Sequence, residues 1–181
     1  YNTTATKYLE KYFTNASAIT KSIQLKDEKK GIDFFVCMNS GKKIKVDAKF
    51  REKGASIWWK NGEEELALEI WSIKPKTYYN FTNLTSKQQL GWTLDDSKET
   101  DYILYVFNEA DSKNIFIFDF ELLKNALQAH GREWIKQYKH VQQRTNAGAY
   151  TWVSEVVFVP ISVVQNAINP KINNSTYLFK N

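Results

Sequence analysis

The stretch KIKVDAKFR, from Lys43 to Arg51, alternates apolar and charged residues without interruption. Strict alternation is typical of a β-strand that buries one face, because successive side chains point to opposite sides of the strand. The apolar face would carry Ile44, Val46, Ala48 and Phe50, and the charged face Lys45, Asp47, Lys49 and Arg51. A solvated edge strand would explain such a charged face, and so would an active site.

Apolar runs on both sides of this stretch predict a sheet. Strands are expected over Ile32–Met38, Lys42–Phe50 and Glu65–Ile73, with turn sequences at Asn39–Gly41 and Lys60–Gly62. The first turn predicts that the first two strands pair as a hairpin. Strands joined by short turns pair in antiparallel fashion, so all three should form a meander.

The rest of the chain mixes helical and strand-like patterns. Helices are expected from Thr3 to about residue 18, over Ser86–Leu94, over Glu121–His130 and over Ile161–Ala167. Further strands are expected over Tyr102–Phe107, Asn114–Phe120 and Trp152–Val159. This order predicts an α/β (α+β) fold with a central mixed sheet, an antiparallel meander and flanking helices. No linker divides the sequence, so we expect a single domain over residues 1–181.

The composition favours a folded and mildly basic protein. Of the 181 residues, 43% are hydrophobic and 15% aromatic, which is enough to fill a core. The net charge of +5 permits a polyanionic partner without establishing one. No apolar run approaches the roughly 20 residues that span a bilayer, so we expect no membrane segment and an intracellular, cytoplasmic location. Abundant Asn, Lys, Ser and Thr suit an AT-rich source such as a phage or a mobile element.

Several classes of chemistry lack the residues that they need. Cys37 is the only cysteine, which excludes an internal disulfide and a zinc site built on cysteines. The sequence has neither a glycine-rich phosphate loop nor a serine nucleophile elbow, so nucleotide hydrolysis and acyl transfer have no support.

Two acidic residues should meet on the hairpin. Asp33 lies 14 residues before Asp47, so a turn near residues 39–42 would pair the positions around them. Like charges on adjacent strands are destabilising, and a bound divalent cation would offset the repulsion. Carboxylate oxygens suit Mg²⁺ or Mn²⁺, and the backbone carbonyl of Ala48 would supply one more oxygen. Lys49 would then hold the attacking water or stabilise negative charge on a phosphate.

The segment GID, ending at Asp33, followed by DAK from Asp47 to Lys49, resembles the motif of the PD-(D/E)XK nuclease superfamily. The residue before Asp33 is Ile rather than the Pro of the motif. The family core implies a first helix, a meander of three strands, another helix and a further strand. The resemblance covers roughly residues 5–107, which we expect to form a restriction-endonuclease-like core. Residues 108–181 would be a C-terminal extension of the same domain.

The resemblance implies a Mg²⁺-dependent (endo)deoxyribonuclease that hydrolyses phosphodiester bonds of nucleic acid, with DNA as the expected substrate. Asp33, Asp47 and the Ala48 carbonyl would hold Mg²⁺ or Mn²⁺, and Lys49 would position the nucleophile. In many members the first helix adds an acidic residue, and Glu10 is the only carboxylate in the helix expected here. Many members act as dimers, so a homodimer is one expected assembly. The alternative is a catalytically inactive module of the nuclease fold that binds nucleic acid or a protein partner.

Other polar residues are candidates for supporting roles. Glu69 stands among apolar residues, where it would either face the site or pair with a cation such as Arg51. Gln88 and Gln89 would reach the site or a DNA backbone, or lie on the surface of a helix. Arg144 precedes a Gly/Ala loop and would either follow a phosphate backbone or belong to a solvated helix face.

Overall fold

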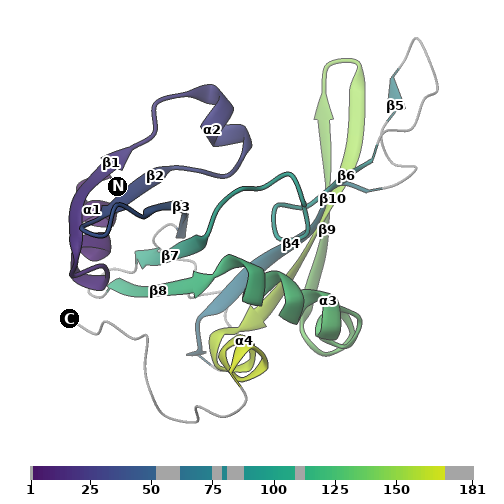
Figure 1. Cartoon of the computed structure of the whole chain (residues 1–181). Helices are drawn as coiled ribbons and strands as arrows, with labels where there is room; N and C mark the ends of the chain where they lie inside the picture. Colours follow the sequence, from purple (N-terminus) through teal and green to yellow (C-terminus); the bar gives the residue numbers. More distant parts are fainter. Residues whose placement is uncertain (1, 52–61, 75–78, 81–87, 109–112, 170–181) are drawn as a thin grey trace. The chain divides into compact units, whose positions relative to one another are not determined.

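The structure is a computed structural model that describes residues 2–51, 62–74, 79–80, 88–108 and 113–169 (Figure 1). These residues form a mixed α/β fold with two sheets and four helices. They divide into two compact units. Unit 1 contains the residues up to Gly62 and those from Ser97 to Glu121, and unit 2 contains those from Glu63 to Asp96 and from Leu122 onward.

Unit 1 is built on one five-stranded sheet. Its elements are α1 (Asn2–Tyr12), β1 (Ala16–Lys21), α2 (Leu25–Lys29), β2 (Phe34–Met38), β3 (Lys43–Arg51), β7 (Tyr102–Asn108) and β8 (Lys113–Asp119). The strand order is β1-β2-β3-β7-β8. The pairs β1–β2, β2–β3 and β7–β8 are antiparallel, whereas β3 and β7 are parallel.

The predicted hairpin is confirmed, and the predicted meander has a different third member. Strands β2 and β3 pair with Phe34 opposite Val46, as the turn at residues 39–41 requires. The third antiparallel strand is β1, which pairs with β2. The run over Glu65–Ile73 was expected in that place, but it is β4 of a second sheet, where its partners are β10 and β6. Residues 52–61, which precede β4 and include most of the predicted second turn, lie outside the described residues.

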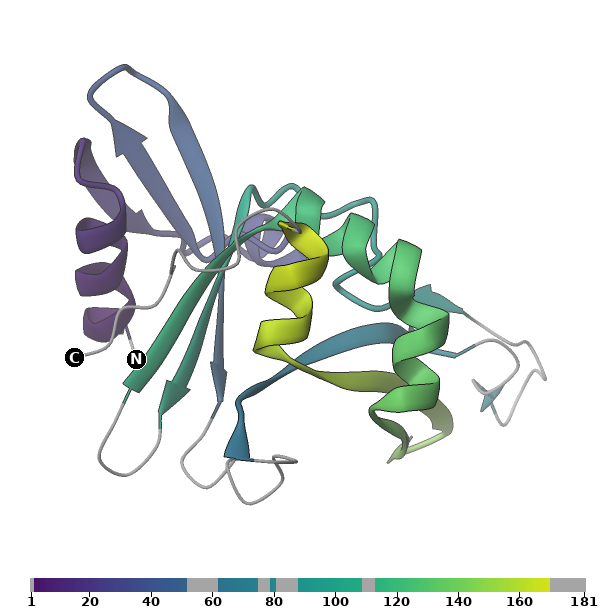
Figure 2. The same cartoon turned by 90° about the horizontal axis from the view of Figure 1, so that it is seen from below.

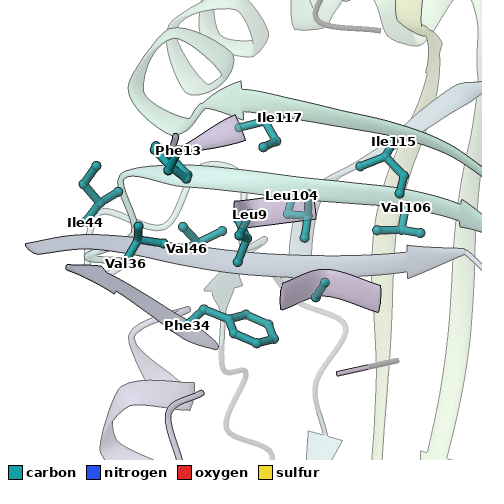
Figure 3. Packing of buried hydrophobic residues seen from close by; sticks show 11 residues of the cluster. Leu9, Phe13, Phe34, Val36, Ile44, Val46, Leu104, Val106, Ile115 and Ile117 are labelled. Carbon is teal, nitrogen blue, oxygen red and sulfur yellow. The ribbon is translucent and has the colours of Figure 1, made fainter. Parts of the chain in front are cut away.

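The core of unit 1 lies between α1 and one face of its sheet. Leu9 and Val46 are fully buried in one apolar cluster with Phe13 (Figure 3). Ala48 and Phe50 pack against the same cluster, so the apolar face of β3 is the core face that alternation predicted. Helix α1 ends at Tyr12, earlier than the expected residue 18, because the chain turns after Phe13 and enters β1 at Ala16.

Unit 2 is built on a second sheet and two helices. Its elements are β4 (Glu65–Ile73), β5 (Tyr79–Asn80), β6 (Gln89–Leu90), most of α3 (Phe120–Gln137), β9 (Lys139–Ala147), β10 (Tyr150–Pro160) and α4 (Ile161–Ile168). The strand order is β5-β10-β4-β6, and β9 pairs with β10. Figures 1 and 2 both show α3 and α4 side by side against one face of this sheet.

Among the elements predicted after residue 85, those with the stronger local sequence pattern were predicted more accurately. Strand β10 and helix α4 are confirmed to within a few residues, and α3 continues to Gln137 instead of ending at His130. The helix expected over Ser86–Leu94 is wrong for its described residues, because Gln89–Leu90 forms β6 and pairs with β4. Strand β9 has no counterpart among the predicted elements.

Each of the two units contains residues from both sides of residue 107. Strand β8, in the expected extension, pairs with β7 in the sheet of unit 1. Strand β4, in the expected nuclease-like core, belongs to unit 2. Strand pairing joins segments that are distant in sequence, so a single cut point does not separate the two units. Among the described residues, no helix is long and apolar enough to cross a membrane.

Candidate active site

The β2–β3 hairpin brings Asp33 and Asp47 together. Each lies one residue beyond the Phe34–Val46 pair, Asp33 just before β2 and Asp47 within β3. The Asp33 backbone N–H donates to the Val46 carbonyl at 2.9 Å. The Asp33 carboxylate accepts a hydrogen bond from the Ala48 N–H at 2.8 Å, through Oδ2. The Asp33 side chain therefore extends the hydrogen bonding between β2 and β3 by one step before β2 begins. This fixes its carboxylate beside the backbone of β3.

Asp47 is a buried carboxylate. Only 4% of the residue is exposed, and its partner on β7 is the fully buried Ile103. Burial, together with the nearby Asp33 carboxylate, raises the pKa of Asp47 to about 6 against the opposing effect of the Lys49 charge. A carboxyl group in this position is costly to ionise, so an added positive charge would stabilise it.

Lys49 supplies part of that positive charge. It lies two residues after Asp47 on the same face of β3, and its Nζ is 2.7 Å from Asp47 Oδ2. Its partner on β7 is Tyr105, which is 2% exposed, whereas the Lys49 side chain is 34% exposed. The ammonium is therefore held against the buried carboxylate while part of the side chain reaches solvent. This is the close approach of two carboxylates and one amine that the sequence predicted.

Gly31 leaves space next to the Asp47 carboxylate. Its φ angle is +72°, a backbone conformation that favours glycine. A Cβ at this position would lie 3.6 Å from Asp47 Oδ2 and 3.2 Å from Cδ of Lys98. Any larger side chain would enter the region beside the carboxylate. The sequence motif included Gly31 without assigning it a role, and the positive φ angle gives it one.

Ion pairs fix the chain around the site. Glu99 contacts Nζ of Lys30 at 2.5 Å and Nζ of Lys45 at 2.9 Å, and these hydrogen bonds lower the pKa of Glu99 to about 2. The backbone N–H of Lys45 donates to Asp101 Oδ2 at 2.8 Å, and the Asp101 N–H donates to the Lys45 carbonyl at 2.8 Å. The segment before β7 is thereby joined both to β3 and to the loop that carries Gly31.

Glu10 does not join Asp33 and Asp47. It is exposed on α1, and α1 packs through Leu9 on the core face of the sheet, where Val46 points. Asp47 points to the opposite face because it is the next residue along the strand. In the described part of the chain, no group of three or more Asp, Glu, His or Cys side chains is arranged to hold a metal. The third carboxylate that the resemblance implied is therefore missing from the cluster as described.

Glu69 and Arg51 have other contacts and belong to different units. In unit 2, Glu69 Oε2 accepts hydrogen bonds from Ser72 Oγ at 2.8 Å and from the Trp92 N–H at 3.1 Å. In unit 1, Arg51 Nε donates to the Tyr105 hydroxyl at 2.9 Å. Glu69 thus accepts hydrogen bonds from donors on β4 and just after β6. The hydrogen bond to Tyr105 holds Arg51 on the charged face of β3.

The remaining candidates lie in unit 2 and are exposed. Gln88 and Gln89 are at β6 rather than on a helix, and both are exposed. Arg144 is exposed on β9, in the hairpin that β9 forms with β10. None of the three belongs to the unit that contains Asp33 and Asp47.

The donor set fits a small hard cation. Mg²⁺ is commonly held by one or two carboxylates and keeps several of its waters, so a pair of aspartates is sufficient. Asp33 and Asp47 would hold it, and a cation there would offset the cost of ionising the Asp47 carboxyl, whose pKa burial raises to about 6. Comparison of the chain with protein-family models, with curated proteins and with solved structures found no match.

Proposed function

We propose that this protein is a metal-dependent nuclease of the PD-(D/E)XK type, which hydrolyses phosphodiester bonds of DNA. The observation that carries the proposal is the grouping of Asp33, Asp47 and Lys49 at the start of the β2–β3 hairpin. The buried Asp47 carboxyl has its pKa raised to about 6 although an ammonium lies 2.7 Å away. A structural ion pair has no need of a second carboxylate, whereas Mg²⁺ is commonly held by one or two.

The order of elements in unit 1 supports the same proposal. Helix α1 is followed by the antiparallel strands β1, β2 and β3, with the short helix α2 between β1 and β2, and β7 then adds to β3 in parallel. The resemblance implies a first helix, a meander and a further strand in this order. It also implies a helix between the meander and the further strand, and the described residues between β3 and β7 contain no helix.

The chain's own groups divide the work of phosphodiester hydrolysis. A bound metal would supply a water of lowered pKa and charge to offset that on the phosphate. Asp33, oriented by the Ala48 N–H, and Asp47 would hold that metal on one side of β3. Lys49 would orient the attacking water with its ammonium or stabilise the negative charge that develops on the phosphate. Glu10 has no part in this mechanism, because α1 lies on the other face of the sheet.

The test is Mg²⁺-dependent cleavage of single-stranded, duplex, flapped and four-way DNA by the purified chain. We expect cleavage by the wild type and a loss of at least about a hundredfold in Asp47→Ala and in Lys49→Ala, since each removes charge from the reacting centre. Lys43→Ala is the matched control, because Lys43 is an exposed lysine of the same strand. Unchanged cleavage in both site variants would remove the proposed mechanism.

The second candidate function is a binding module of the same fold without catalysis. Two observations favour it: Lys49 is already paired with Asp47, and the described residues group only two carboxylates at the site. Calorimetric titration of Mg²⁺ or Mn²⁺ into the wild type and Asp33→Ala separates the candidates. DNA binding without any metal binding would favour the module over the nuclease.

The proposed substrate also bears on where and how the protein acts. The proposal includes action inside a cell, and the composition suits a phage or mobile-element source. The proposal includes a homodimer because two copies of the site would cut both strands of a duplex. Sedimentation of the chain with and without duplex DNA would measure it, and a monomer in both states would exclude it.

A further inference from the structure

The β9–β10 hairpin is a long, regular ribbon. Nine consecutive residue pairs join the strands, from Lys139 opposite Phe158 to Ala147 opposite Tyr150. Gly148, with a φ angle of +56°, lies in the turn between them. Strand β10 pairs with β4 from Glu155 onward and with β5 through Tyr150 and Thr151, so among the described residues β9 is the edge strand of this part of the sheet. Figure 1 shows the two strands as a narrow pair of arrows.

One face of the ribbon carries three polar side chains in a row. Gln142, Arg144 and Asn146 are alternate residues of β9 and therefore point to the same side. All three are exposed, and the residues opposite Arg144 and Asn146 on β10 are Val153 and Thr151. The Thr151 hydroxyl donates to Asn146 Oδ1 at 2.9 Å, which orients the Asn146 amide with its NH₂ group left to donate.

The exposed charge of the ribbon is positive. Between Lys139 and Pro160 the only carboxylate is Glu155, and it is 7% exposed. Its two oxygens are paired with His140 Nε2 at 2.6 Å and with Lys74 Nζ at 3.0 Å. Arg144 therefore stands on a ribbon whose own carboxylate is buried and paired, which is complementary to a polyanion.

These residue types are those that recognise base edges in duplex DNA. Arg makes paired hydrogen bonds to guanine O6 and N7, and Asn and Gln make them to adenine N6 and N7. Strands of β-ribbons and β-sheets are among the elements that read DNA in its grooves. Alternate residues of a strand are about 6.7 Å apart, close to two base-pair steps of about 3.4 Å, so successive side chains would meet bases about two pairs apart.

We propose that the β9–β10 ribbon enters the major groove of DNA and recognises bases through Gln142, Arg144 and Asn146. The proposal rests on the proposed function for the choice of duplex DNA as the partner. It goes further by giving unit 2 a role in sequence recognition, with guanine opposite Arg144 and adenines opposite the two amides. The ribbon would thus select the sequence that unit 1 cleaves.

The test is selection of bound duplexes from a random library by the full chain in EDTA, where no metal-dependent cleavage occurs. We expect a consensus with a guanine and adenines about two base pairs to either side. Arg144→Ala should weaken the preference for guanine over other bases at that position by roughly 5- to 150-fold. The adenine preferences at the other two positions should remain. Gln142→Ala should relax one adenine position. Gln143→Ala is the matched control, since Gln143 is exposed on the other face of β9 and should leave the consensus unchanged.

Each outcome decides for or against base recognition, independently of cleavage. Selection without any consensus would overturn the proposal. A uniform loss of affinity for all sequences in Arg144→Ala, with a smaller salt dependence, would assign Arg144 to a phosphate and overturn it as well. Self-association that Arg144→Ala abolishes would make the ribbon an interface with a second copy. If a consensus is found but no DNA is cleaved in Mg²⁺, the ribbon's role stands and the proposed nuclease activity fails.

Discussion

Replacing Asp47 by Asn should stabilise the protein at neutral pH in the absence of divalent cations. The pKa of Asp47 is raised from an ordinary value of 3.8 to about 6, chiefly because the group is buried. The folded state therefore retains a proton that the unfolded chain releases between about pH 4 and 6. Stability falls as the pH rises through this window, because the unfolded state binds fewer protons than the folded state. An amide at position 47 has no proton to lose and avoids the cost.

The size of the effect follows from the pKa difference. A shift of about two units, at about 1.4 kcal/mol per unit, corresponds to about 3 kcal/mol above pH 6. Solvent screens little of this, since Asp47 is 4% exposed. The difference in unfolding free energy between Asp47→Asn and the wild type should be near zero at pH 4 and reach up to about 3 kcal/mol at pH 7.5.

The assay is urea unfolding of both proteins from pH 4 to pH 8 in EDTA. Glu10→Gln, on the exposed side of α1, is the matched control and should follow the wild type at every pH. Mg²⁺ at a hundred times the wild-type dissociation constant should then stabilise the wild type by about 2.7 kcal/mol and Asp47→Asn by about 1.4 kcal/mol or less, because the substitution weakens the binding by at least about tenfold. Parallel stability curves for Asp47→Asn and the wild type would refute the claim that Asp47 carries an unfavourable buried charge.

Three substitutions test the packing around this site and in unit 2. Gly31→Ala should lower the free energy of unfolding, measured in urea, by about 1–2 kcal/mol, because its φ is +72° and its Cβ would lie 3.6 Å from the Asp47 carboxylate. An unfolding free energy equal to that of the wild type would contradict this. Leu9→Ala should cost about 2–5 kcal/mol, since Leu9 is fully buried in the unit 1 core, and a loss below about 1 kcal/mol would contradict the packing. Gly91→Ala should lower the free energy of unfolding by about 1–3 kcal/mol or more, because its Cβ would lie 2.2 Å from the Glu69 carbonyl oxygen. An unchanged thermal unfolding curve would exclude this close approach of Gly91 to Glu69.

The sequence predicted the features that depend on local pattern. Alternation from Ile44 to Phe50 identified the core face of β3, and the turn at Asn39–Gly41 set a register that brings Asp33 beside Asp47. Both follow from rules that act within a few residues: side chains alternate along a strand, and a short turn fixes the pairing of its hairpin. The candidate site could therefore be found without knowledge of the whole fold.

Features that depend on distant partners were not predictable in the same way. Strand β4 has a strong apolar pattern, but the pattern does not say that β10 is its partner instead of β3. Strand β9 lacks an apolar face and resembled a solvated helix, because its order comes from pairing with β10. Glu10 was assigned from its place in a helix, and which face of the sheet α1 covers is decided by tertiary packing.

The most direct test of the site is calorimetric titration of Mn²⁺ into the wild type, Asp33→Asn and Asp47→Asn, with Glu10→Gln as the control. The wild type and Glu10→Gln should bind one ion per chain above pH 6, where Asp47 is ionised. Each aspartate substitution should weaken that binding by at least about tenfold, because each removes one of two negative ligands. Equal binding by all four proteins, or no binding by the wild type, would contradict a cation site formed by Asp33 and Asp47.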